Sequence, residues 1–214
     1  MSEQTAENEV CIEAYGLTPT ALLAECGALT PRFTAVHGTH LAGSDIGLFG
    51  VNECTICMCP TTERDLADGI GPALALRTAG ARLSLGSDSH AVIDLFEEAR
   101  AVEHHERLAS QVRGRHSAPS LLRSATVHGH RSLGWDDAGT IAVGERADLV
   151  TVTLDSVRTA GTPPGSAIEA AVFAAAASDV THVLVDGRVV VADGRHATLD
   201  VPAELQVSIA ELLD

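Results

Sequence analysis

The sequence predicts an α/β fold in which helices cover a parallel sheet, followed by a smaller module rich in β-structure. Short apolar segments alternate with helical segments through the first 134 residues, an order typical of parallel sheets. The apolar segments end in reactive or turn-forming residues, namely His37, Pro60 and Asp88. After Trp135 the pattern changes, and an Asp-Gly pair between two valine-rich runs predicts a β-hairpin.

The first part of the chain is predicted to alternate strands and helices. Apolar runs that stop at turn-forming residues predict strands over residues 33–37, 55–60 and 83–88. Apolar spacing, together with caps and closing glycines, predicts helices over residues 18–26, 44–50, 72–79, 94–113 and 119–133. Polar composition predicts a loop over 61–69 and a disordered start over 1–10.

Capping residues support two of these helices. Thr18 can cap the first helix, with Pro19 at its first helical position, and Ser44 can cap the second. The helix over 94–113 has a charged face and an opposite apolar face. Its residues predicted to point inward are Leu95, Ala99, Val102, Leu108 and Val112.

The second part is predicted to be a separate unit, so the domains are 1–134 and 135–214. Two short β segments are expected between residues 140 and 154, and an alanine-rich helix is expected over 166–177. The hairpin covers 183–191, with its turn at Asp186-Gly187.

Composition excludes several classes of partner. Lys and Arg number 14 against 29 Asp and Glu, a net charge of −15 that repels phosphate backbones and anionic lipid. We therefore expect neither nucleic acid nor membrane as a partner. The N-terminus lacks the pattern of a signal peptide, and five cysteines indicate free thiols, so we expect a cytoplasmic protein. Aromatic residues make up only 3% of the chain, which counts against ligands held by stacking.

The cysteines of Cys54-x-x-Cys57-x-Cys59 have two interpretations. Thiolates at this spacing can close on one zinc ion. The alternative is a buried strand that accommodates small apolar cysteines. Histidines outside the strand ends are interpreted as surface or structural residues, and they are His104, His105, His128, His130, His182 and His196.

The candidate site lies where the predicted parallel strands end. His37 and Asp88 follow two strands, and Glu3 is expected on the same face. A histidine beside a carboxylate can activate water, and a second acid can deliver a proton to a departing amine. The alternatives are a core histidine for His37 and a helix N-cap for Asp88.

Four motifs in order and spacing resemble the amidohydrolase superfamily, and within it the formimidoylglutamate deiminase family of histidine degradation. They are Val36-His37-Gly38-Thr39-His40, Cys59-Pro60-Thr61-Thr62-Glu63, Leu66-Ala67-Asp68-Gly69-Ile70 and Gly86-Ser87-Asp88-Ser89-His90. The resemblance implies the C-terminal half of a metal-dependent (β/α)8 barrel, joined to the C-terminal part of a small β-sandwich. The implied reaction is hydrolysis of the small molecule N-formimino-L-glutamate to N-formyl-L-glutamate and ammonia.

The resemblance also implies roles for individual residues. Asp88 is implied to be a ligand of one zinc ion and to take a proton from water. His37 is implied to orient the hydroxide and stabilise the tetrahedral intermediate, and Glu3 to carry a proton to the departing nitrogen. Loop positions suggest substrate contact for Glu63, Arg64 and His90, with a cap or a surface ion pair as the alternative for each.

The chain departs from the family pattern at the metal ligands. The His-x-His pair and the fifth-strand histidine of that pattern have no counterpart in these residues. We therefore expect this chain alone to be a truncated, inactive form that does not retain zinc. A complementing N-terminal half, or a homo-oligomer, is the expected partner. The alternatives are a related deaminase of a ring substrate and a non-catalytic barrel remnant.

Overall fold

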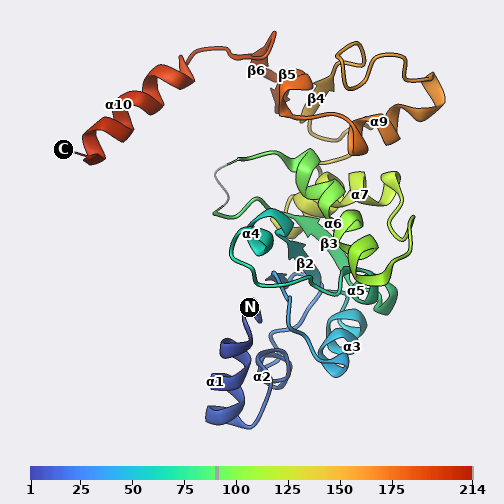
Figure 1. The fold of residues 1–214 in the computed structure, drawn as a ribbon, viewed down its shortest axis with the longest axis vertical. Helices are drawn as coiled ribbons and strands as arrows, with labels where there is room; N and C mark the ends of the chain where they lie inside the picture. The colour runs from blue at the N-terminus through green and yellow to red at the C-terminus, as the bar shows by residue number, and fades with distance from the viewer. Residues whose placement is uncertain (90–91, 214) are drawn as a thin grey trace.

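The computed structural model describes residues 1–89 and 92–213 and places a parallel sheet at the centre of the first part (Figure 1). Its strands pair in the order β1, β2, β3, with Ala35 opposite Ile56 and Ile56 opposite Leu83. Their bounds are β1 Thr34–Val36, β2 Thr55–Met58 and β3 Arg82–Leu85. The predicted strands are confirmed, although each ends earlier than its apolar run.

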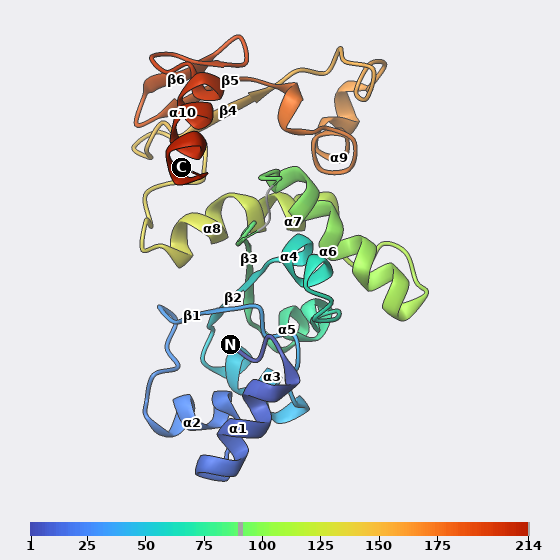
Figure 2. The same cartoon turned by 60° about the vertical axis from the view of Figure 1, so that its left-hand side comes forward.

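Helices pack against this sheet. Figures 1 and 2 show α6, α7 and α8 between the sheet and the second module, with α1 and α2 at the opposite end. The bounds are α1 Thr5–Tyr15, α2 Pro19–Glu25, α3 Gly43–Val51, α4 Pro60–Asp65, α5 Ala73–Ala79, α6 Leu95–Ser110, α7 Ala118–Ala125 and α8 Val127–Ser132. The core between sheet and helices includes Ile56, Leu83, Phe49, Leu76 and Leu121, all of them buried.

Local capping explains where the early helices begin. The hydroxyl of Thr18 accepts the amide of Ala21, which confirms it as the cap of α2. The predicted cap at Ser44 is wrong, because Ala42 occupies that position. The carboxylate of Asp45 accepts the Ala42 amide at 3.1 Å and also the Thr18 hydroxyl at 2.7 Å. The carboxylate of Asp45 therefore marks this helix start, and a long-range hydrogen bond from Thr18 holds it.

The disordered start expected for residues 1–10 is also wrong. Residues from Thr5 onward form α1, which ends at the left-handed Gly16. The side chain of Gln4 donates to Asp68 at 3.0 Å, and that of Asn8 donates to the carbonyl of His40 at 2.6 Å. These contacts hold a polar helix that has no buried residue of its own.

Two further expectations need correction. Part of the loop expected over 61–69 is α4, whose residue Thr61 donates its amide and hydroxyl to the buried carboxylate of Glu98 on α6. The helix expected over 119–133 is two helices, since the backbone at Thr126 departs from helical geometry. On α6, Ala99 and Val102 are buried as predicted.

The apolar face predicted for α6 is shorter than expected. The helix ends at Ser110 rather than at residue 113. The side chains of Leu95, Leu108 and Val112 are exposed, so the inward face ends near Glu103.

The second module contains an antiparallel sheet in the order β4, β5, β6, β7. The predicted Asp-Gly turn is confirmed, since Asp186 and Gly187 both have the positive φ that such a hairpin requires. One of the two segments expected between 140 and 154 is a strand. The bounds are β4 Leu149–Val152, α9 Ala167–Phe173, β5 Val180–Val185, β6 Arg188–Ala192, β7 Arg195–His196 and α10 Val201–Leu213, with 3-10 turns at Pro164–Ser166 and Ala177–Asp179.

The alanine-rich helix expected over 166–177 is confirmed as the shorter α9, whereas α10 has no counterpart in the sequence predictions. In the part of the chain that the structure describes, no helix is both long and apolar enough to cross a membrane. The closed barrel, the β-sandwich and the division into domains 1–134 and 135–214 stay predictions.

Helices α3 and α5 cross at Gly50, where a Cβ atom would lie 2.1 Å from the carbonyl oxygen of Ala79. We predict that Gly50→Ala lowers the free energy of unfolding by about 2–3 kcal/mol, because the helices must separate. Gly47→Ala on the same helix has nothing within 4 Å of the new Cβ and should raise that energy by up to about 1 kcal/mol. Urea denaturation of both variants checks this, and equal effects would contradict it.

Acid sensitivity should arise from His116, which is 2% exposed and whose ring nitrogens have no hydrogen-bond partner among the described residues. Burial, with nearby Arg77, lowers the pKa of His116 to about 4 from 6.5. The unfolded chain binds this proton near pH 6.5 and the folded chain only near pH 4. Stability present above pH 6.5 is therefore lost as the pH falls toward 4.

We predict that His116→Phe removes about 2 kcal/mol of the stability difference between pH 7 and pH 5. Urea denaturation at the two pH values measures it. The control is His182→Gln in the hairpin module, which should leave the difference unchanged. An unaltered pH dependence in His116→Phe would show that another group is responsible.

Candidate metal and acid–base site

The backbone of Met1 extends the edge of the parallel sheet beside β1. Its amino group donates to the carbonyl of Val36 at 3.1 Å, and its carbonyl accepts the amide of Gly38 at 3.0 Å. These two bonds are those of a parallel pairing of Met1 with His37. Glu3 therefore leaves the sheet edge beside the point where His37 follows β1.

The backbone turns at both strand ends that carry the site. His37 and Asp88 have φ values of 69° and 46°, in the left-handed region that non-glycine residues seldom adopt. The amide of His37 donates to the carbonyl of Cys57 at 2.9 Å, which holds the turn against β2. These turns direct both side chains toward Glu3.

The three residues predicted as the site come together. Nε2 of His37 lies 3.6 Å from Oε1 of Glu3 and 3.7 Å from Oδ2 of Asp88. One ligand atom from each residue lies within 4.8 Å of the others, which is compact enough for one metal ion. The His37 side chain is buried, that of Glu3 is 21% exposed and that of Asp88 is 37% exposed. The cluster is thus open on the Asp88 side.

Glu63 supports His37 from behind, a role that the sequence analysis missed. Its carboxylate is 1% exposed, accepts the amide of Cys59 at 3.1 Å and lies 3.6 Å from Nδ1 of His37. The position four residues after Cys59, in the first turn of α4, is the signal that could have indicated this contact. The substrate contact predicted for Glu63 stays a prediction.

Electrostatics favour a proton within this cluster. The close carboxylate of Glu63, and then the charge of Glu3, raise the pKa of His37 above its usual value. Burial and the neighbouring Asp68 raise the pKa of Glu3. A histidine and an acid that both hold protons more tightly than usual are suited to proton transfer between water and a leaving group.

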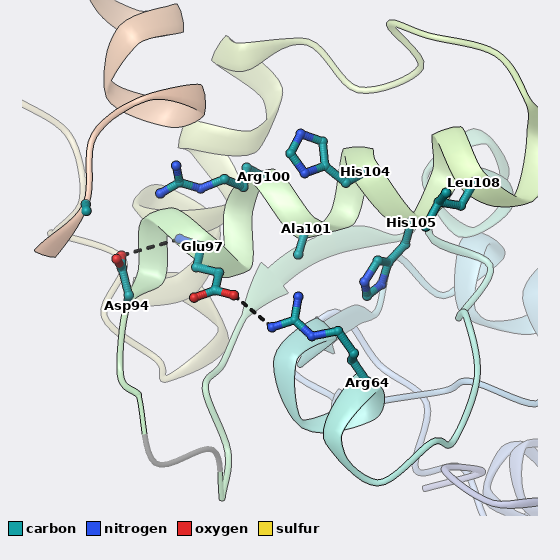
Figure 3. A pocket seen from close by; sticks show the side chains of 9 residues that line it. Arg64, Asp94, Glu97, Arg100, Ala101, His104, His105 and Leu108 are labelled. Atoms are coloured by element: carbon teal, nitrogen blue, oxygen red, sulfur yellow. Dashed lines mark hydrogen bonds and ion pairs between the residues drawn. The ribbon is translucent and has the colours of Figure 1, made fainter. Parts of the chain in front are cut away.

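Arg64 lies apart from the cluster, in a groove of about 460 Å³ between α4 and α6 (Figure 3). It forms an ion pair with Glu97 at 2.8 Å, which is the surface pair that the sequence left open. His105 faces Arg64 across the same groove, and His104 also lines it (Figure 3). Substrate contact by Arg64 stays a prediction, and His90 lies outside the described residues.

The cysteines do not converge on one point. Cys54 is buried in the core, with its thiol 3.4 Å from the carbonyl of Thr30, whereas the sulfur atoms of Cys57 and Cys59 both lie near Gly86. The structural zinc interpretation for all three is therefore wrong. His128 and His130 contact the carbonyls of Leu83 and Thr126, as expected of structural residues.

The family model described as the amidohydrolase family matches residues 1–190, and the chain belongs to this family. A formimidoylglutamate deiminase from Pseudomonas aeruginosa is 33% identical over 222 residues, an alignment that covers 100% of this chain and 49% of that protein. A 5-methylthioadenosine/S-adenosylhomocysteine deaminase from Desulfitobacterium hafniense is 32% identical over 206 residues, covering 94% of this chain and 47% of that protein.

Solved structures show the same relationship. A crystal structure of an adenosine deaminase from Xanthomonas campestris with bound zinc has a TM-score of 0.89 and 30% identity. That match covers 97% of this chain and 48% of the other. The chain therefore spans about half the length of the relatives it matches, and those relatives include a deiminase and a deaminase named for different substrates.

We predict that Glu63→Gln lowers the pKa of His37 toward 6.5, because the contact that raises it loses its charge. An NMR titration of the imidazole resonances measures the shift. The control Glu97→Gln removes a carboxylate from the surface pair with Arg64 and should leave His37 unchanged. If His37 titrates identically in Glu63→Gln, Glu63 does not support it.

Proposed function

We propose that this chain carries part of the catalytic centre of a cytoplasmic, metal-dependent deiminase. The proposed reaction is hydrolysis of N-formimino-L-glutamate to N-formyl-L-glutamate and ammonia. The observation that carries the proposal is the convergence of Glu3, His37 and Asp88 at the ends of neighbouring strands. Free cysteines at all five positions suit a reducing compartment.

The donor atoms fit a divalent metal such as zinc. A partly exposed carboxylate on Asp88, beside an imidazole and a second carboxylate, offers the oxygen and nitrogen ligands that zinc takes. We assign Asp88 as the ligand from this chain and propose that the other ligands come from outside these residues. When bound, the metal supplies a water of lowered pKa.

We propose that the residues of this chain transfer protons and orient the attacking water. The Asp88 carboxylate takes a proton from the attacking water. The imidazole of His37, held by Glu63, donates a hydrogen bond to the oxygen of that water, orients it for attack on the formimino carbon and stabilises the tetrahedral intermediate. The electron pair of the C=N bond moves to nitrogen as the C–O bond forms. Glu3 delivers one proton to that nitrogen, and the hydroxyl proton of the intermediate supplies the second as the C=O bond forms and the C–N bond breaks, so the nitrogen leaves as ammonia. The proton taken by Asp88 then restores Glu3.

A second candidate is deamination of a purine-like ring. It is favoured by relatives of similar identity, such as an 8-oxoguanine deaminase from Pseudomonas aeruginosa at 34% over 208 residues. Low aromatic content counts against it, because ring substrates are commonly held by stacking. A third candidate is a barrel remnant without catalysis, which would carry no stoichiometric metal.

The expected partner is a chain segment that supplies further strands and metal ligands. Val36 is 41% exposed on the face of the sheet, which leaves apolar surface for a further segment to cover. We propose a complementing N-terminal half rather than a homo-oligomer, because the matched relatives are about twice as long as this chain.

Two proteins test this function, one translated with the in-frame sequence upstream of Met1 and one beginning at Met1. With zinc, the first should release ammonia from N-formimino-L-glutamate and the second should not. In the longer protein, Asp88→Asn, Glu3→Gln and His37→Asn should each lower kcat by at least about 100-fold. The exposed Glu25→Gln is the matched control and should leave kcat unchanged.

Each remaining outcome has a defined meaning. Turnover by the chain that begins at Met1 would overturn the proposal that the centre is shared. If S-adenosylhomocysteine or 8-oxoguanine is turned over faster than N-formimino-L-glutamate, the proposed substrate is wrong. A stop codon directly upstream of Met1, with no bound zinc, would favour the non-catalytic remnant.

A further inference from the structure

Cys57 and Cys59 lie together on the open face of the parallel sheet. Side chains alternate along β2, so Ile56 and Met58 enter the core beneath the helices while Cys57 faces the other way. Cys59 follows the strand, and its sulfur lies near the same residue, Gly86, as that of Cys57. Cys57 is half-buried and Cys59 is 1% exposed. The pair is therefore reached from the open face, through Cys57.

The sulfur atoms of Cys57 and Cys59 both lie close to the same point beside Gly86. A Cβ atom added at Gly86, just after β3, would lie 3.1 Å from Sγ of Cys57 and 3.2 Å from Sγ of Cys59. Because glycine stands there, this space is left to the thiols. The hydroxyl of Ser84, opposite Cys57 in β3, is buried beside the Cys57 sulfur and lowers the pKa of that thiol. A buried polar side chain thus lies next to the sulfur pair.

We propose that Cys57 and Cys59 form a dithiol site that binds one thiophilic centre through both sulfur atoms, as a trivalent arsenical does. The sulfur pair adjoins the carboxylate cluster, because the Cys59 amide donates to Glu63, but the proposed ligands are the two thiols alone. Sulfur ligands select soft centres, whereas the carboxylate cluster suits zinc and harder ions. The site goes beyond the proposed deiminase activity and does not depend on it.

The protonation of the pair suits such binding. The neighbouring Cys59 thiol holds the pKa of Cys57 at about 7, so Cys57 is partly thiolate near neutral pH. The same contact raises the pKa of Cys59, whose proton is released when the second sulfur bonds. With phenylarsine oxide, two S–As bonds form, the As=O bond breaks, and the two thiol protons leave with the oxygen as water.

The test treats the 214-residue chain with phenylarsine oxide, followed by an excess of a monothiol that removes arsenic from lone cysteines. Intact mass spectrometry should then show one phenylarsenic group per chain. Cys57→Ser and Cys59→Ser should each weaken retention by at least about 100-fold. Cys26→Ser removes an exposed lone cysteine and should retain the adduct fully.

A second measurement needs no variant and separates loss of the site from loss of folding. In the wild-type chain, bound phenylarsine oxide should protect Cys57 and Cys59 from alkylation by iodoacetamide, as mapped on peptides, while Cys11 and Cys26 stay reactive. Retention of the adduct in either single serine variant would overturn the proposal. So would alkylation of both Cys57 and Cys59 in the arsenical-treated protein.

Discussion

The parallel alignment of β1, β2 and β3 is the constraint on which the candidate site depends. Parallel strands bring their carboxyl ends to one edge, so residues far apart in sequence meet there. His37 follows β1 and Asp88 follows β3, and the backbone bonds of Met1 add Glu3 to the same edge. Main-chain hydrogen bonds therefore bring Glu3, His37 and Asp88 to one edge of the sheet, independently of the interactions between their side chains.

The alternation of side chains along β2 separates structural from chemical residues. Ile56 packs into the core, where burial of a side chain of this size stabilises the fold by roughly 1.5–3 kcal/mol. Cys54 lies on that side and is inert, whereas Cys57, on the other side, faces the open surface. A shift of one residue in register would exchange these roles, so the core that fixes the register also fixes which thiols are accessible.

The features predicted correctly from sequence are those with local signals. The Thr18 cap, the Asp186-Gly187 turn and the strand that precedes Asp88 each depend on a few adjacent residues. The errors arose where a second candidate or a distant group decides the conformation. The neighbouring Asp45, which the distant Thr18 holds, caps α3 in place of Ser44. Glu98 on α6 accepts the backbone amide of the first turn of α4. The support that Glu63 gives to His37 was missed for the same reason, because α4 had been predicted as a loop.

The balance of charge around His37 indicates what the site requires. Carboxylates of Glu3, Glu63 and Asp88 lie within 3.7 Å of its ring nitrogens, in a chain that already carries a net charge of −15. Like charges at this spacing repel one another, and burial strengthens the repulsion. A protonated imidazole relieves part of it, which is why the pKa of His37 is raised, with Glu63 contributing most. A divalent cation beside Asp88 would relieve more, so this arrangement of donors is stabilised by the kind of ion that the proposed hydrolysis needs.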